Sequence, residues 1–412
     1  MGMYLSLLLY IAKWMATGII FLKNMISFRI SQLSPSPTLV LDAKVKEMQR
    51  SGMPVINLGI GEPDFETPPN IKRAAIKAIR DGFTHYTETA GILELRKEIA
   101  EKFERENHVL YDPSEIVVGC GSKHLLYSVF QVLCKERDEV LVPVPTWSTY
   151  IKQIKLAGGK PKLIKLFPPF KLTAKDIIKN VSSHTQIILI NSPANPTGAM
   201  IDDEELDKIA HLAVKHKLWV VSDEIYEKIT YGKKHISIAS LNKKIKERII
   251  TINGFSKAYA MTGWRVGYAA GPKEVISAMG SLQSQMTSNT SSISQMAALE
   301  AISGKQDPVE KMRREFWKRS DFVLSLLCKI EGLSFVRPEG AFYFFVSLNQ
   351  LFGKGFKTSR DWCEALLGKE QVAVVPGEAF LYPGYFRLSF ACSLKDLSEG
   401  IVRISRFVKK YV

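Results

Sequence analysis

The chain has 412 residues, of which 46% are hydrophobic, and a formal net charge of +15. This composition excludes a disordered or collagen-like chain, and size scaling favours one large domain accompanied by a smaller one. The 56 lysines and arginines are spread along the chain without an aromatic-interleaved basic stripe, which favours an enzyme with anionic ligands over a nucleic-acid-binding protein.

The chain begins with a hydrophobic extension. Residues 3–22 are long enough to cross a bilayer, but Lys13 near their centre costs about 2.5 to 3.5 kcal/mol, whereas each Leu, Ile or Phe returns only about 0.3 to 0.6. No basic segment precedes the run and no A-x-A-like cleavage site follows it, which argues against a secretory signal. Met25 is an alternative start. We expect 1–27 to be a start-site artefact or dispensable extension, ahead of an anchor or an organelle-targeting leader, and the protein to be cytoplasmic without a stable membrane partner.

Between about residues 115 and 270, short apolar runs alternate with stretches of helical periodicity such as 203–215. The run 187–190 is apolar without alternation, which indicates a strand buried on both faces of a mostly parallel sheet. Helices on both sides of such a sheet give an α/β fold, in which ligands bind at the carboxyl ends of the strands. The predicted strands are 116–118, 139–144, 162–166, 186–191, 218–223, 249–253 and 266–270.

From about Pro308 the pattern changes to that of a smaller α+β domain. A charged helix is predicted over 310–327. It is followed by predicted short strands at 334–336, 342–346, 372–375 and 386–390. We expect an N-terminal arm over 28–58 that belongs partly to the small domain, a large domain over 59–305 and a small domain over 306–412.

Residues 254–267, with the sequence GFSKAYAMTGWRVG, form the most specific motif. Lys257 is preceded by a hydroxyl and followed eight residues later by Arg265, a combination suited to one aldehyde and one phosphate. A lone lysine after a strand is ordinarily a solvated charge. The whole motif, however, resembles the cofactor-lysine signature of class I and II aminotransferases, which use pyridoxal phosphate (PLP). The resemblance implies PLP fold type I with a seven-stranded sheet, and a Schiff base between Lys257 and PLP.

Polar residues follow two of the strands that precede this motif. Asp223 ends a buried run, and PLP needs a carboxylate against its pyridine nitrogen because the protonated ring is the electron sink. By the resemblance, Tyr226 and Asn195 donate hydrogen bonds to the phenolate oxygen of the cofactor. Two such bonds contribute about 1.5 to 3 kcal/mol each, which keeps the lysine imine unprotonated and reactive. Alone, an Asn-Pro turn predicts only a loop.

Residues 119–123 form a Gly-rich turn between a strand and an amphipathic helix, where free N–H groups and the helix dipole attract oxyanions. Such a turn alone is a weak motif. The resemblance implies a phosphate site formed by Gly121, Ser122, Ser256 and Arg265. It also implies that Trp147 stacks on the pyridine ring, for which ordinary core packing is the alternative.

The resemblance also assigns residues to the substrate and to a second subunit. Arg387 resembles the arginine that binds the α-carboxylate of the substrate through its planar fork. Gly61 matches the glycine whose backbone lies over the substrate, which Trp147 and Asn195 are expected to contact as well. Tyr86 resembles the residue that reaches the cofactor phosphate of the neighbouring subunit. A homodimer with shared active sites is therefore expected.

The resemblance covers about residues 28–410 and is greatest to the prokaryotic-type aspartate aminotransferases of subgroup Ib. The other main subgroup binds the side-chain carboxylate with an arginine of the partner subunit, but this chain has no arginine between Lys273 and Glu310. Subgroup Ib uses a lysine, a serine and a threonine, and the matching positions are Lys123, Ser36 and Thr38. Aspartate and 2-oxoglutarate are therefore the expected substrates. Since single contacts discriminate by only about 1 to 3 kcal/mol, aromatic, neutral and prephenate or arogenate substrates stay open.

The implied reaction is a ping-pong amino transfer, in which Lys257 moves the proton of the substrate Cα while Asp223 keeps the ring protonated. A PLP β-lyase would share nearly all of these cofactor residues and is the main alternative. A PLP-sensing transcription regulator needs a winged-helix domain, for which fewer than thirty residues precede the family region.

The cysteines indicate a reducing compartment and no metal site. None belongs to a C-x-x-C pair or to a Cys/His cluster with zinc-ligand spacing. The five are Cys120, Cys134, Cys328, Cys363 and Cys392.

Overall fold

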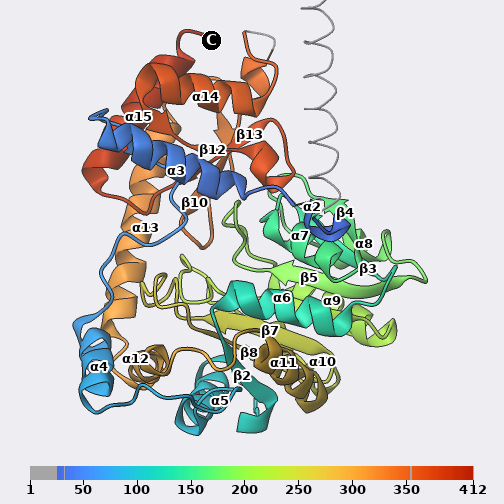
Figure 1. Cartoon of the computed structure of the whole chain (residues 1–412). Helices are drawn as coiled ribbons and strands as arrows, with labels where there is room; N and C mark the ends of the chain where they lie inside the picture. The colour runs from blue at the N-terminus through green and yellow to red at the C-terminus, as the bar shows by residue number, and fades with distance from the viewer. Residues whose placement is uncertain (1–25, 32, 353–354, 412) are drawn as a thin grey trace, which may run out of the picture. The chain divides into compact units, whose positions relative to one another are not determined.

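The computed structural model describes residues 26–31, 33–352 and 355–411 (Figure 1). The chain divides into two compact units between Ser36 and Pro37. The described part of the first unit contains the short helix α2 (Phe28–Ser31). The predicted leader and the alternative start at Met25 lie outside the described residues, and the predicted boundaries near 58 and 305 stay predictions.

A seven-stranded sheet forms the centre of the larger unit, with the strand order β2-β8-β7-β6-β5-β3-β4. Strand β8 is antiparallel to both of its neighbours, and the other pairs are parallel. All seven predicted strands are present, which confirms the α/β fold class. Their bounds are Ile116–Gly119 (β2), Glu139–Val144 (β3), Lys160–Lys165 (β4), Thr185–Asn191 (β5), Trp219–Asp223 (β6), Ile249–Gly254 (β7) and Gly267–Ala270 (β8).

Strand β5 shows why its apolar run does not alternate. Ile187 and Leu189 pack into a core with helices α6, α7 and α11, whereas Ile188 and Ile190 pack into a core with α4, α5, α9, α10 and α12 on the other face. Each fully buried side chain of this kind contributes about 1.5 to 3 kcal/mol. The helices are α4 (Pro69–Arg80), α5 (Leu93–Asn107), α6 (Ser122–Leu133), α7 (Thr149–Leu156), α8 (Ala174–Ile178), α9 (Asp203–Lys215), α10 (Lys243–Lys246), α11 (Lys273–Met286) and α12 (Ser292–Ser303).

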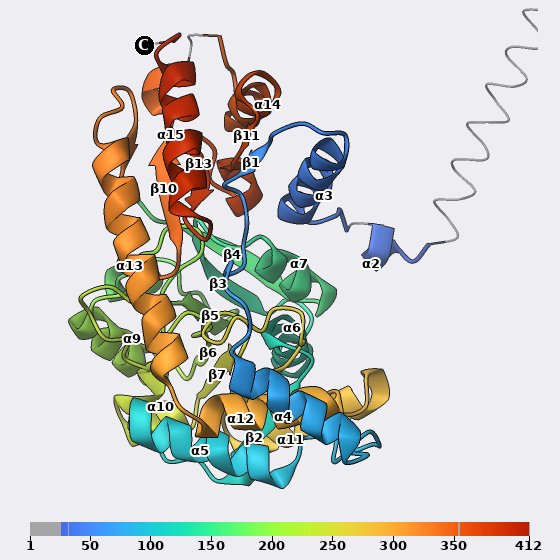
Figure 2. The same ribbon diagram turned by 90° about the vertical axis from the view of Figure 1, so that its left-hand side faces the viewer.

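A second, smaller sheet has the order β12-β13-β10-β9, and in Figure 1 it lies above the seven-stranded sheet in orange and red. The long helix α13 runs beside both sheets and packs against α15 in its upper part (Figure 2). The strands are β9 (Ser334–Phe335), β10 (Tyr343–Ser347), β12 (Val375–Pro376) and β13 (Tyr385–Ser389). The helices are α3 (Pro37–Arg50), α13 (Asp307–Leu327), α14 (Ser359–Glu370) and α15 (Leu394–Val408).

The predicted strand over 372–375 is two strands in the structure. β11 (Val372–Ala373) pairs in parallel with β1 (Ile56–Asn57), and β12 pairs with β13 of the small sheet. The chain therefore changes pairing partners at Val374. Its residues before Val374 pair with β1, which precedes the large sheet in the sequence, and its residues after Val374 pair with β13.

Six strands run in one direction and end at one edge of the large sheet, and β8 begins at that edge because it runs in the opposite direction. Gly267 pairs with Gly119 and Gly254, so the ends of β2 and β7 meet the start of β8. A Cβ on Gly267 would lie 2.8 Å from the backbone nitrogen of Ser122 and 3.0 Å from the carbonyl oxygen of Asn253. Glycine at this position lets the start of α6 pack directly on the strands.

Gly267→Ala is expected to destabilise the fold, because the added methyl group forces α6 away from the sheet, at a cost of about 1 to 3 kcal/mol. Gly280→Ala is the matched control: Gly280 lies within α11 and a Cβ there meets no atom within 4 Å. This control should gain about 0.5 to 1 kcal/mol from helix propensity. Thermal melting of both variants measures whether each substitution lowers or raises the stability of the fold. An unchanged melting temperature for Gly267→Ala would contradict the packing argument.

Candidate active site

Asp223, the last residue of β6, is a buried carboxylate at the strand edge. It is 3% exposed and accepts hydrogen bonds from the Tyr150 hydroxyl at 2.6 Å and the Ile225 N–H at 3.3 Å. Burial raises its pKa to about 6, against the effect of these two bonds. Sequence analysis predicted Asp223 but missed Tyr150. The available signal was its place three residues after Trp147, which brings the two rings to 5.4 Å in an edge-on contact.

Lys257 lies in the loop between β7 and β8, and its ammonium group donates a hydrogen bond to the carbonyl oxygen of Gly61. The loop therefore meets the segment that contains Gly61, as predicted for two residues of one site. Burial lowers the pKa of Lys257 to about 8. The nearby Glu62 carboxylate opposes this shift, whereas the positive charges of Arg387, Arg265 and Lys123 add to it. An amine with this pKa is neutral, and hence nucleophilic, at a pH where an ordinary lysine is not.

Gly121, Ser122 and Arg265 meet at the N-terminus of α6, which no side chain caps. Gly121 has φ +83°, and a Cβ there would lie 2.4 Å from Nη2 of Arg265. Among the described residues, Arg265 donates to the carbonyl oxygens of Thr262 at 2.9 Å and Cys120 at 3.3 Å. The Ser122 hydroxyl donates to the Asn253 carbonyl oxygen at 3.0 Å. A helix N-terminus and a guanidinium group thus face the same space, an arrangement that suits an oxyanion.

Ser256 and Trp147 lie beside these groups. Ser256 directly precedes Lys257 and is 8% exposed. The ammonium nitrogen of Lys123 lies 4.9 Å from the centroid of the Trp147 ring. Partial burial, followed by the charge of Arg265, lowers the pKa of Lys123. Lys123, which is predicted to bind the side-chain carboxylate of the substrate, therefore lies next to Trp147, which is predicted to stack on the cofactor ring.

Arg387, in β13, is a buried guanidinium group without a carboxylate partner among the described residues. It is 2% exposed, and its Nη atoms donate to Asn195 Oδ1 at 3.0 Å and to the Gly59 carbonyl oxygen at 2.7 Å. Its Nε has no hydrogen-bond partner. Burial of an unpaired charge is costly, so this arrangement calls for an anionic ligand.

Tyr226 follows Asp223 by one turn of chain and is buried. Its hydroxyl lies 2.9 Å from the hydroxyl of Tyr343, a residue that sequence analysis did not select. Burial raises the pKa of Tyr226 well above its usual range, and the contact with Tyr343 adds to this. The hydroxyl therefore stays protonated, and able to donate a hydrogen bond, across the physiological pH range.

Three further residues were predicted to contact the substrate or a second subunit. Tyr86, between α4 and α5, is 88% exposed. Ser36 ends the N-terminal unit and Thr38 lies in the first turn of α3. Their predicted contacts with substrate or with a second subunit stay predictions.

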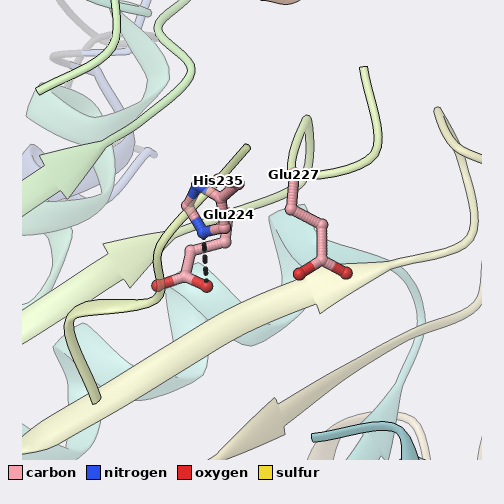
Figure 3. Close-up of side chains that lie close together, drawn as sticks. All are labelled: Glu224, Glu227 and His235. Atoms are coloured by element: carbon pink, nitrogen blue, oxygen red, sulfur yellow. Dashed lines mark hydrogen bonds and ion pairs between the residues drawn. The ribbon is translucent and has the colours of Figure 1, made fainter. Parts of the chain in front are cut away.

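Glu224, Glu227 and His235, which follow Asp223 in the chain, form a group (Figure 3). Their ligand atoms are close enough for a cation, but both carboxylates have protein partners. Glu224 binds His235 at 3.0 Å and the hydroxyls of Ser222 and Ser237 at 2.9 and 3.0 Å.

Glu227 pairs with the buried ammonium group of Lys102 and accepts from Asn107 at 3.1 Å. Burial alone would raise the pKa of Glu227, but Lys102 and Lys228 hold it at about 2. The group fastens the segment after β6 to α5 and has a structural role. Sequence analysis did not select Lys102, since only the fold brings it to Glu227.

Comparisons with known proteins agree with this geometry. Residues 53–404 match the family described as aminotransferase class I and II. The aspartate aminotransferase of Bacillus subtilis (strain 168) is 47% identical over 387 residues, which are 93% of this chain and 98% of that protein. The probable aspartate/prephenate aminotransferase of Aquifex aeolicus (strain VF5) is 46% identical over 390 residues, again 93% and 98% of the two chains.

Solved structures of similar proteins have the same fold. The aspartate aminotransferase from Rhizobium meliloti has a TM-score of 0.90 at 41% identity, covering 94% of this chain and 99% of that chain. The aspartate aminotransferase from Thermus thermophilus with maleate has a TM-score of 0.89 at 39% identity, covering 93% and 99%. With its fold and these matches over nearly its whole length, the chain belongs to the class I and II aminotransferase family, and the protein is an aminotransferase.

Proposed function

We propose that the protein transfers the amino group of aspartate to 2-oxoglutarate by a ping-pong mechanism, with PLP as its cofactor. One feature supports this above all. A buried carboxylate, Asp223, lies near a partly buried amine, Lys257, and three further cations, Arg387, Arg265 and Lys123, lie near that amine. In the described part of the chain, no carboxylate lies within ion-pairing distance of Arg265, Arg387, Lys123 or Lys257. A site with this charge pattern suits a ligand that carries a phosphate and several carboxylates.

The residues present fit PLP. Lys257 offers an amine for the aldehyde, and Asp223 offers a buried carboxylate for the pyridine nitrogen. Gly121, Ser122, Ser256 and Arg265 offer an anion site for the phosphate, with Trp147 beside it for the ring. When bound, PLP supplies an electron sink that makes the Cα proton of an amino acid removable.

The residues of the chain then have separate tasks. Arg387 binds the α-carboxylate of the substrate and neutralises its own buried charge by doing so. Lys257 takes the proton from the substrate Cα, for which its lowered pKa of about 8 suits it. Asp223 would hold a proton on the ring nitrogen of bound PLP. Tyr150 donates to the Asp223 carboxylate and favours the ionised form that this task requires.

The substrate class and the assembly are the finer parts of the proposal. Lys123, with Ser36 and Thr38, is proposed to bind the side-chain carboxylate of aspartate. Support comes from relatives named aspartate aminotransferase and from a related structure that contains maleate, a dicarboxylate. Tyr86 is proposed to reach the active site of a second copy in a homodimer, for which its exposure leaves it available. None of the helices among the described residues has the length and apolar character needed to cross a membrane. A cytoplasmic location is proposed.

Prephenate is a second candidate amino acceptor. Relatives from Rickettsia and Aquifex that are 44–46% identical are named probable aspartate/prephenate aminotransferases. Incubation of the protein with aspartate and prephenate, followed by mass-spectrometric detection of arogenate, tests this second activity.

Lys257→Ala is expected to abolish covalent attachment of PLP and to lower aspartate:2-oxoglutarate turnover by at least about 10²- to 10⁴-fold, because nucleophile and base are lost together. Borohydride reduction and peptide mapping locate the attached cofactor in the wild-type protein. Lys244→Ala, which removes an exposed lysine of α10, should label and turn over normally. Attachment of PLP to Lys257→Ala at another lysine would contradict the assignment.

The pH dependence of Lys257 provides a test without cofactor. Its pKa is lowered to about 8, so its neutral amine appears at lower pH than that of an ordinary lysine, whose pKa is about 10.4. After removal of bound cofactor, the rate of acylation of Lys257 should rise through a midpoint near pH 8. Lys208, whose pKa is raised by its hydrogen bond and ion pair with Glu205, should reach its own midpoint at higher pH. Mass-spectrometric peptide mapping measures both, and equal midpoints would contradict the lowered pKa.

Lys123→Ala is expected to lower kcat/KM for aspartate about 10- to 200-fold, the range for loss of a single pocket contact. The kcat/KM for alanine, which has no side-chain carboxylate, should change little. The ratio of the two values separates a lost carboxylate contact from general damage to the site. Unchanged aspartate kinetics would refute the proposed role of Lys123.

A further inference from the structure

Tyr343, the first residue of β10, connects several of the residues assigned to the site. It is fully buried, and its hydroxyl lies 2.9 Å from that of Tyr226. The face of its ring lies 4.2 Å from the guanidinium carbon of Arg387. A Cβ on Gly61 would lie 3.7 Å from the same hydroxyl. One side chain therefore touches the proposed cofactor and α-carboxylate residues at once.

The small sheet fixes Tyr343 in this position. β10 and β13 are antiparallel, with Tyr343 opposite Ser389 and Phe345 opposite Arg387. Tyr343 and Phe345 share one face of the sheet, so Tyr343 is the diagonal neighbour of Arg387 on that face. The contact depends on the register of two buried strands and is held more firmly than a contact between loops.

We propose that Tyr343 is a positioning residue for amino transfer, whose ring orients Arg387 toward the α-carboxylate and whose hydroxyl orients that of Tyr226 toward the cofactor. This inference rests on the proposed function. Its two halves involve different atoms of one side chain and can be separated by substitution.

The proposed role of the Tyr343 hydroxyl follows from the number of protons that the Tyr226 and Tyr343 hydroxyls can share. Two phenol groups at 2.9 Å share one hydrogen bond, and either of them can be the donor. When Tyr226 donates to an oxygen of the bound cofactor, Tyr343 must donate to Tyr226. A donor chain of this kind strengthens each of its bonds. Burial raises the pKa of both hydroxyls, so both keep their protons at neutral pH.

The proposed role of the Tyr343 ring follows from the surroundings of Arg387. Its guanidinium group lies between the rings of Tyr343 at 4.2 Å and Phe380 at 5.1 Å. Aromatic faces attract a cation that has little contact with water. They also confine the guanidinium plane, while Asn195 and Gly59 hold two of its donors. The fork that would meet a carboxylate is thus oriented before the substrate arrives.

Two variants of the full-length enzyme with bound PLP separate the two halves. Tyr343→Phe keeps the ring and removes the hydroxyl, whereas Tyr343→Leu removes both. Tyr382→Phe is the matched control, because it removes a buried tyrosine hydroxyl that donates to the Leu166 carbonyl oxygen at 2.7 Å. The measurements are the pH titration of the visible absorbance of the bound cofactor, the dissociation constant of maleate, and KM and kcat for aspartate.

Tyr343→Phe should move the midpoint of the absorbance titration upward by about half a pH unit, the scale of one neutral hydrogen bond. Its maleate affinity and its KM for aspartate should stay within about twofold of wild type, because the ring that faces Arg387 remains. Tyr343→Leu should show the same titration shift and bind maleate about 3- to 30-fold more weakly, with a corresponding rise in KM. Tyr382→Phe should match the wild-type enzyme in all measurements.

A wild-type midpoint in Tyr343→Phe would overturn the hydroxyl half, and wild-type maleate affinity in Tyr343→Leu would overturn the ring half. Equal effects in Tyr382→Phe would show a general effect of hydroxyl loss and overturn the inference. If Tyr343→Leu does not fold, weaker maleate binding by Tyr343→Phe would still contradict the proposed division. A wild-type protein that takes up no PLP would instead overturn the proposed function itself.

Discussion

The buried Asp223 carboxylate at the end of β6 is the constraint on which the site depends. A carboxylate in this environment needs hydrogen bonds, and Tyr150 and the Ile225 N–H supply them. Directly after Asp223 in the chain, Glu224 binds His235 and Glu227 binds Lys102. These two contacts fix the segment that follows β6. Tyr226 belongs to this fixed segment, and its hydroxyl contacts that of Tyr343 in the small sheet.

Cations that have no acidic partner in the described part of the chain complete the arrangement. In most proteins a buried arginine is paired with a carboxylate, because an isolated buried charge is costly. Arg387 instead has an amide oxygen, a carbonyl oxygen and two aromatic faces. An anion that enters from solution would relieve this imbalance, which supports the carboxylate and phosphate ligands proposed above.

Local patterns predicted most of the framework. The non-alternating run in β5 indicated burial on two faces, and the structure divides its residues between two cores. Helix α9 has the bounds that its helical periodicity predicted, and acidic residues in its first turn and Lys215 in its last suit the helix dipole. Asp223, Lys257 and Arg265 were predictable because each stands directly beside a strand end in a recognisable motif. The split of 372–375 into two strands was not, since it depends on pairing with residues more than 300 positions earlier.

The sequence by itself determined the order of strands and helices, the motif around Lys257 and the chemical types of the groups in the site. These are local properties, set by hydrophobic period and by residues close together in the chain. Only the tertiary structure decided that Tyr150 meets Asp223, that Lys102 meets Glu227 and that Tyr343 joins Tyr226 to Arg387. Each of these contacts joins residues 44 to 125 positions apart. Their formation depends on strand register and on the packing of two cores, which no single segment specifies.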